Sequence, residues 1–190
     1  MAFEVRTNTA IDESIYYKKH KSGLDVYIVP KKMSTSYALF GTKFGSIDNK
    51  FICDGRETVL PDGIAHFLEH MAFNGTKNLP DKAMIERLEA TGVQFGLNLN
   101  AATSWDYTKY EIKDLPVTEE NVDLALLILH DWSQFIALEP AEIDSERGVI
   151  MEELRMRDGA SWRGTIKMLQ ALGKGTRYEH RNLIGHLDGL

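Results

Sequence analysis

The sequence contains a single cysteine, Cys53, among its 190 residues. One cysteine excludes an intramolecular disulfide and a cysteine-based metal knuckle, and a lone cysteine is more often a small buried hydrophobe than a nucleophile. No stretch reaches the roughly 18 apolar residues that a membrane-spanning helix needs. Residues 1–15 show no apolar signal region. For the chain as given we therefore expect a cytoplasmic protein with no membrane partner, and a periplasmic parent protein is the alternative.

An excess of basic residues is also missing. The chain has 28 acidic residues against 22 Lys and Arg, so its formal net charge is −6 at pH 7. Proteins that bind nucleic acid neutralise phosphates with basic patches. The one basic cluster, residues 18–21, lies in a segment that alternates like a strand and is expected to be solvated. The sequence therefore predicts no nucleic-acid partner.

The order of the predicted elements is strands, helices, strands, helices. A helix is expected to start at Pro61-Asp62-Gly63 and to run to about Phe73, and residues 49–59 are expected to form a loop. This order favours an α+β fold, a mostly antiparallel sheet with helices packed on one face as a two-layer sandwich. The remaining strands are expected over 16–22 and 24–30 (a hairpin), 37–47, 93–102 and 107–112, and the remaining helices over 81–91, 118–138, 140–158 and 162–172.

The segment His66–His70, with the sequence HFLEH, carries the strongest chemical signal. Residues at i and i+4 share one face of a helix, so both imidazoles reach the same ion. Glu69 points to nearly the same side. A catalytic zinc needs three protein ligands and an open position for water. Imidazole is a preferred ligand type for zinc. The pattern predicts His66 and His70 as metal ligands, Glu69 as the general base that activates the attacking water, and a third ligand elsewhere.

The alternative for this segment is a pair of ordinary histidines on a surface helix. At about 100° per residue, Phe67, Leu68 and Met71 fall on one side of the helix, whereas Phe73 falls among the two histidines and the glutamate. A helix that is apolar on both sides is buried, and buried His and Glu side chains need a partner or a metal. The pattern therefore favours the metal site.

The predicted helix over residues 140–158 supplies candidates for the third ligand. Glu146 and Glu153 fall between two sets of apolar residues, where a carboxylate is costly to bury unless it is paired. Glu152 falls at the edge of that face and is expected to be solvated. Seven residues of helix separate Glu146 from Glu153 by about 10.5 Å, so one is expected to bind the ion and the other to hydrogen-bond a ligand. Helix geometry alone does not choose between them.

Several segments resemble the pitrilysin/insulinase family of zinc peptidases, the inverzincins. HFLEH with the following residues Met71–Thr76 resembles the family's inverted zinc-binding motif. Residues 99–104 (LNAATS) are similar to its substrate-strand segment, and residues 146–153 (ERGVIMEE) to the helix that carries the last ligand. The resemblance covers residues 16–190. It implies that Zn²⁺ is the cofactor, that Glu153 is the third ligand and that Glu146 lies behind the ligands.

The resemblance also implies a substrate and a partner. An extended peptide is expected to add as a strand beside residues 99–103, with Asn100 and Ala101 contacting its backbone. The alternative for Asn100 is a polar residue at a strand end. Family members usually join two such domains and carry a second half that closes over the substrate. We therefore expect residues 1–190 to be a single zinc-peptidase domain, the N-terminal catalytic domain of a longer or assembling enzyme with a second homologous domain or subunit.

The two parts of the chain resemble different branches of that family. Residues 16–70 are similar to bacterial processing proteases of Gram-positive organisms, and residues 71–190 to large periplasmic zinc proteases. A natural mosaic and an engineered chimera both account for this. The interval between His70 and Glu153 is somewhat longer than usual, which an insertion between the motifs would explain.

These observations predict a zinc-dependent endopeptidase that hydrolyses extended peptides with metal-activated water. The competing hypothesis is a non-catalytic assembly or substrate-clamp module, or an isolated fragment, that binds zinc without turnover. An intact motif with a buried base disfavours a scaffold, because a scaffold has no need of that base.

Overall fold

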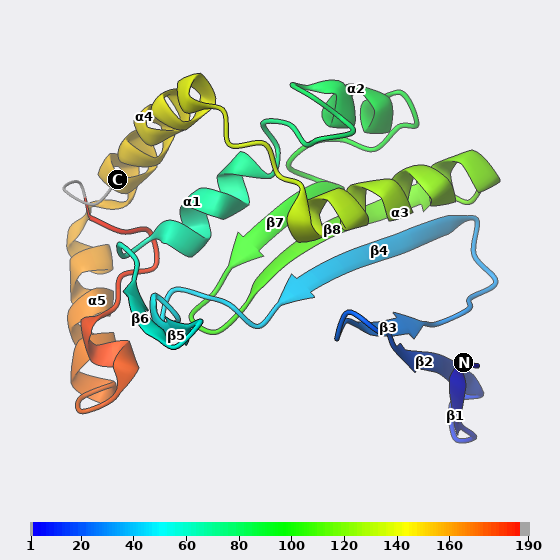
Figure 1. Ribbon diagram of the computed structural model, residues 1–190, viewed down its shortest axis with the longest axis horizontal. Coiled ribbons are helices and arrows are strands. Elements are labelled where there is room, and N and C mark those ends of the chain that lie inside the picture. The colour runs from blue at the N-terminus through cyan, green and yellow to red at the C-terminus, as the bar shows by residue number, and fades with distance from the viewer. Residues whose placement is uncertain (1, 187–190) are drawn as a thin grey trace. The chain divides into compact units, whose positions relative to one another are not determined.

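The computed structural model describes residues 2–186 and divides into two compact units, Met1–Ser34 and Thr35–Leu190 (Figure 1). The first unit is an antiparallel sheet of strands β1 (Glu4–Asn8), β2 (Glu13–Lys19) and β3 (Asp25–Ile28) in that order. The predicted hairpin of β2 and β3 is confirmed. Strand β1 was not predicted, because its sequence EVRTN carries a single apolar residue and all five residues are exposed.

The second unit is built on an antiparallel sheet of β4 (Thr35–Thr42), β7 (Leu99–Thr103) and β8 (Thr108–Pro116). Its strand order is β4-β8-β7, so β7 lies at one edge. Alternation along β4 sends Ala38 and Phe40 into the core, whereas Tyr37 and Leu39 on the opposite face are exposed. The sheet is therefore covered on one face, as the alternating sequence predicts.

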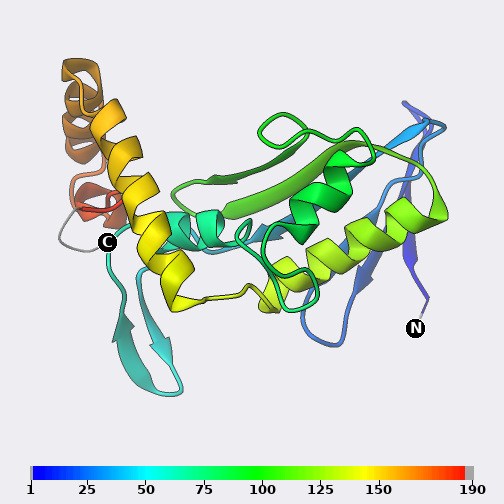
Figure 2. The same ribbon diagram turned by 90° about the horizontal axis from the view of Figure 1, so that it is seen from above.

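Helices cover the inner face of this sheet. Helix α3 (Glu119–Gln134) packs on β4 and β8, and α1 (Ile64–Met71) packs on β7 and β8. Helices α3 and α2 (Ala83–Glu89) contribute to one core, which also contains Ala72, the C-cap residue of α1, and the adjacent Phe73. Helix α4 (Pro140–Arg157) packs against α1 and is followed by α5 (Ala160–Leu172) and a 3₁₀ turn, Arg177–His180 (Figures 1 and 2). The predicted α+β fold, with an antiparallel sheet and helices on one face, is confirmed.

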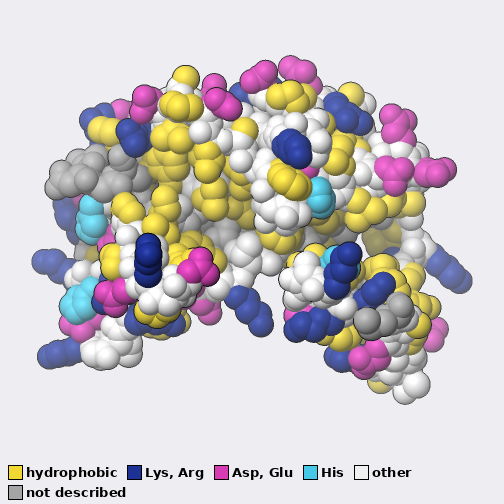
Figure 3. All heavy atoms as spheres, viewed as in Figure 1, with side chains coloured by type: hydrophobic (Ala, Val, Ile, Leu, Met, Phe, Trp, Pro, Cys, Tyr) yellow, Lys and Arg dark blue, Asp and Glu magenta, His cyan; other side chains and the backbone are white. Residues whose placement is uncertain are grey.

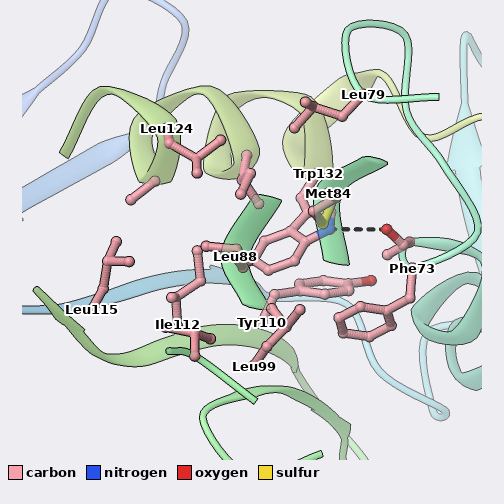
Figure 4. Packing of buried hydrophobic residues seen from close by; sticks show 14 residues of the cluster. Phe73, Leu79, Met84, Leu88, Leu99, Tyr110, Ile112, Leu115, Leu124 and Trp132 are labelled. Atoms are coloured by element: carbon pink, nitrogen blue, oxygen red, sulfur yellow. Dashed lines mark hydrogen bonds between the residues drawn. The ribbon is translucent and has the colours of Figure 1, made fainter. Parts of the chain in front are cut away.

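Aromatic side chains form the part of the core next to α1. The Trp132 ring from α3 lies 5.3 Å from Tyr110 of β8 and 5.8 Å from Phe73, centroid to centroid. Trp132 Nε1 also donates a 3.0 Å hydrogen bond to the carbonyl of Ala72, which caps α1 (Figure 4). The end of α1 is thus fixed by packing and by a buried polar contact.

The expectation of a loop over residues 49–59 was wrong. This segment is a hairpin of β5 (Lys50–Cys53) and β6 (Arg56–Val59), which precedes α1 and projects away from it (Figure 2). Asp54 and Gly55 connect the strands with positive φ angles of 50° and 75°, the conformation for which an Asp-Gly pair is favoured. Cys53 lies on this hairpin and is exposed, contrary to the expectation that it is buried.

The surface carries both charged and apolar side chains. Among residues 2–186, no helix is long and apolar enough to cross a membrane. On the face shown in Figure 3, acidic and basic side chains are interspersed. Apolar side chains also reach the surface of α4, where Val149 is 51% and Met156 is 81% exposed, whereas Ile150 is buried. Only one of the two apolar sets expected on this helix is therefore covered within the described chain.

Helix α1 begins at a glycine that the packing requires. Gly63 has φ +88°, and a Cβ atom added there would lie 2.2 Å from the carbonyl oxygen of Ile184. The segment around Ile184 and Gly185 therefore lies directly against the first turn of α1. No side chain other than hydrogen fits without displacing backbone.

We predict that Gly63→Ala lowers the free energy of unfolding by about 1–3 kcal/mol, because it combines a strained φ with a backbone clash. Urea titration followed by circular dichroism measures the change. Gly148→Ala is the matched control, since Gly148 lies inside α4 with open space around it; it should stabilise the protein by about 0.5–1 kcal/mol. Equal effects from the two substitutions would contradict this account.

Candidate metal centre

Helix α1 presents three polar side chains to the same region. His66 is 6% exposed, and its ring lies 4.6 Å from that of His70, centroid to centroid. Glu69 is half-buried on the same helix. The i, i+3 and i+4 spacing therefore brings together the three residues that the sequence motif singled out.

Helix α4 brings a carboxylate to the two imidazoles. Glu153 Oε2 lies 3.5 Å from His66 Nε2 and 3.5 Å from His70 Nε2. One ligand atom from each of the three residues lies within 4.8 Å of the others. Tetrahedral zinc ligands at about 2.1 Å from the ion are separated by about 3.4 Å, so the donor types and their spacing fit a zinc ion.

The second carboxylate, Glu146, lies on the other side of the His70 ring. Its Oε1 is 2.8 Å from His70 Nδ1, and its Oε2 accepts a 2.6 Å hydrogen bond from Asn74 Nδ2. Lys82 Nζ in turn donates to Asn74 Oδ1 at 2.8 Å. The two carboxylates that sequence reasoning left open thus face different nitrogens of one imidazole. Glu152, by contrast, is 63% exposed and pairs with Arg155, as expected for a solvated residue.

Two contacts at this site were missed by sequence reasoning. Arg157 Nη2 lies 2.6 Å from Glu153 Oε1, and the guanidinium also stacks over the Trp162 ring at 5.9 Å. The outer oxygen of Glu153, Oε1, is therefore paired with Arg157, while the inner oxygen, Oε2, faces the two histidines. A Glu–Arg pair at i, i+4 is a known helix-surface signal and could have indicated this contact.

The second missed residue is Thr103, at the end of strand β7. Its Oγ1 donates a 2.6 Å hydrogen bond to Glu69 Oε2. Burial raises the pKa of Glu69, and the bond from Thr103 opposes that rise. The residue lies in the LNAATS segment that resembles the substrate strand, but only the packing of β7 on α1 shows that it reaches the glutamate.

The two histidines have opposite electrostatic environments. Burial, reinforced by the neighbouring His70, lowers the pKa of His66 to about 4. For His70 burial again disfavours the charged form, but hydrogen bonds to Glu146 and Glu153 outweigh it and raise the pKa to about 9. The same bonds to His70 lower the pKa of both carboxyls. His66 is thus held neutral, the form that binds a metal.

Asn100 and Ala101 lie on the edge strand β7. Asn100 is exposed, Ala101 is half-buried, and the Ala101 amide donates a 2.9 Å hydrogen bond to Asn100 Oδ1. Both are two or three residues from Thr103, which contacts Glu69. The structure therefore places the two residues expected to bind substrate on the strand that also touches the expected base.

Comparison with known proteins agrees with this geometry. The family model of insulinase, peptidase family M16, matches residues 56–184. The probable zinc protease PqqL of Escherichia coli is 42% identical over 127 residues, 66% of this chain and 14% of that protein. The uncharacterized zinc protease YmfH of Bacillus subtilis is 38% identical over 157 residues, 80% of this chain and 34% of that protein.

A solved structure shows the same fold. The first half of the periplasmic protease PqqL from E. coli superposes with a TM-score of 0.79 and 34% identity, covering 92% of this chain and 36% of that one. The fold and the matching sequences define the class as a peptidase-family domain. The chain belongs to the insulinase-type peptidase family M16. It spans only 14% and 34% of the lengths of the two relatives.

The environment of His70 predicts a pH-dependent stability of the metal-free protein. A folded-state pKa of about 9 exceeds the ordinary value of about 6.5. The contribution is therefore complete below pH 6.5 and is lost as the pH rises through 9. With chelator present, we expect the free energy of unfolding to fall by about 1–3 kcal/mol across this range.

Replacement of the carboxylates distinguishes this cause from others. Glu146→Gln should reduce the decline between pH 6.5 and 9, because it removes one partner of protonated His70. Glu152→Gln on the same helix should leave the decline unchanged, since Glu152 is solvated. Urea titrations at half-unit pH steps measure both, and parallel curves for Glu146→Gln and the parent chain would refute the assignment.

Proposed function

We propose that this chain binds Zn²⁺ through His66, His70 and Glu153 and forms the catalytic site of an endopeptidase that hydrolyses extended peptides. The observation that carries the proposal is the position of Glu153 Oε2, 3.5 Å from the Nε2 atoms of both histidines. Two neutral or neutralisable imidazoles and one carboxylate are a donor set used by catalytic zinc sites. The names of the relatives as zinc proteases support the same metal.

When bound, zinc would act as a Lewis acid that lowers the pKa of water and polarises the scissile carbonyl. Glu69 is proposed as the general base, which accepts the proton of the attacking water and passes it to the leaving amine. Its raised pKa brings the carboxyl closer to neutral pH, where both transfers are efficient. Thr103 holds Oε2 of this carboxylate, which leaves Oε1 for the water.

Two further groups have proposed supporting roles. Glu146 binds Nδ1 of His70, which fixes the ring so that Nε2 faces Glu153. Such a contact behind a ligand typically changes metal affinity 10- to 100-fold. Arg157 similarly holds Glu153 through its outer oxygen. These contacts hold two of the ligands in place without metal.

The peptide is proposed to add as a strand at the outer edge of β7, with Asn100 and Ala101 at its backbone. Strand addition requires the Ala101 amide to exchange its bond with Asn100 Oδ1 for one with the peptide. The chain would thereby supply half of a substrate site. Because it spans only part of the length of its relatives, we propose that it is an N-terminal catalytic domain that works with a second homologous domain or subunit.

The non-catalytic alternative accounts less well for the site. An assembly or clamp module needs neither a buried base nor a hydroxyl that orients it. The bond between Thr103 and Glu69 therefore favours an enzyme. Zinc binding and turnover are separate properties, and the experiment below measures each.

The test is zinc analysis combined with peptide cleavage, with and without chelator. The parent chain, Glu69→Gln and Glu152→Gln should each bind one zinc ion, whereas His66→Ala and Glu153→Gln should lose it. Glu69→Gln should lower kcat by about 10²–10⁴-fold, while Glu152→Gln should not change it. Normal cleavage by Glu69→Gln would refute the proposed base. Zinc bound without any turnover would favour the non-catalytic alternative.

A further inference from the structure

The outer edge of β7 is partly occupied by the chain itself. The Leu99 amide donates to the carbonyl of Gln94 at 3.1 Å, and the Leu99 carbonyl accepts from the amide of Gly96 at 2.9 Å. Phe95 is therefore paired in parallel with Leu99. It takes the position opposite Leu99, which a residue of an added strand would otherwise occupy.

Pairing also fixes the direction of the Phe95 side chain. Paired residues of neighbouring strands point to the same face of a sheet, and Leu99 is fully buried beneath the helices. The Phe95 ring accordingly packs edge-on against Phe73, with centroids 5.2 Å apart. Phe73 in turn packs on Trp132 of the core. One side of the Phe95 ring is thus fixed by its contact with Phe73, while 51% of the residue's surface remains exposed.

The other end of the edge is bounded by the proposed base. Thr103 donates to Glu69 Oε2, so the segment from Leu99 to Thr103 has the loop at one end and the glutamate at the other. Ala101 lies midway between them, and its amide donates a hydrogen bond to Oδ1 of the neighbouring Asn100. Two residues of strand span about 7 Å. A peptide residue opposite Ala101 would therefore lie between Phe95 and Glu69.

We propose that Phe95 is the end wall of a peptide-binding subsite that takes a large apolar side chain from the residue paired with Ala101. This inference rests on the proposed function, because it requires a peptide strand on β7. The side chain of that residue points to the helix-covered face, as Ala101 does, and meets the exposed ring of Phe95. Aromatic and aliphatic side chains gain contact there, whereas a charged one loses hydration without a partner.

The test uses the zinc-loaded Glu69→Gln chain, which should bind peptides without cleaving them. The probes are three fluorescein-labelled nonapeptides of alternating Ser and Thr whose central residue is Phe, Ala or Lys. Fluorescence anisotropy gives Kd for each peptide, with the Phe peptide expected to bind about tenfold more tightly than the Ala peptide. Adding Phe95→Ala should reduce this preference to about twofold, and Phe95→Leu should restore part of it.

Leu126→Ala is the control, because Leu126 is comparably exposed, at 58% against 51% for Phe95, but lies on α3. It should leave the tenfold preference unchanged. A preference for Phe that persists in Phe95→Ala, or no preference among peptides that do bind, would overturn the subsite and leave the proposed function intact. Zinc binding without binding of any peptide would overturn both the strand-edge site and the subsite. Loss of zinc from the Glu69→Gln chain would refute the metal site itself.

Discussion

The pairing of imidazoles on α1 with carboxylates on α4 is the interaction on which the site depends. His70 has a carboxylate at each ring nitrogen, and His66 is almost fully buried. Removing one partner of a buried charged pair typically costs about 3–5 kcal/mol, because the remaining charge loses both water and partner. The two helices are therefore joined by the groups that would also bind the metal, so assembly of the site and packing of this part of the fold are one event.

Much of the second unit could be predicted because local pattern and tertiary packing agree. The alternation of Ala38 and Phe40 along β4, and the turn at Gly63 before α1, each indicate the observed element without knowledge of the rest. The grouping of His66, Glu69 and His70 on one side of α1 could be predicted for the same reason, since i, i+3 and i+4 spacing is a property of one helix. Helix periodicity also reduced the third ligand to Glu146 or Glu153, and family resemblance selected Glu153.

What the sequence left open depends on contacts between distant segments. Nδ1 of His70 faces Glu146 and Nε2 faces Glu153 because of the way α4 packs on α1. Helix periodicity cannot predict how two helices pack. Thr103 reaches Glu69 only because β7 packs beside α1. The hairpin at Asp54 and Gly55 was missed for a different reason: its short strands are exposed on both faces and carry little hydrophobic alternation, although the Asp-Gly turn signal was present.

The contact between Gly63 and Ile184 limits when α1 can complete its packing during synthesis of the chain. The first turn of α1 is packed by a segment that leaves the ribosome only after every other element described. Glu153 follows His70 by 83 residues, about half the length of the second unit. At about 5–20 residues per second, roughly 4 to 17 seconds pass between synthesis of His70 and of Glu153. During that interval the nascent chain carries the two histidines without Glu153, so the cluster of His66, His70 and Glu153 cannot form on the ribosome until strand β7 has already been made.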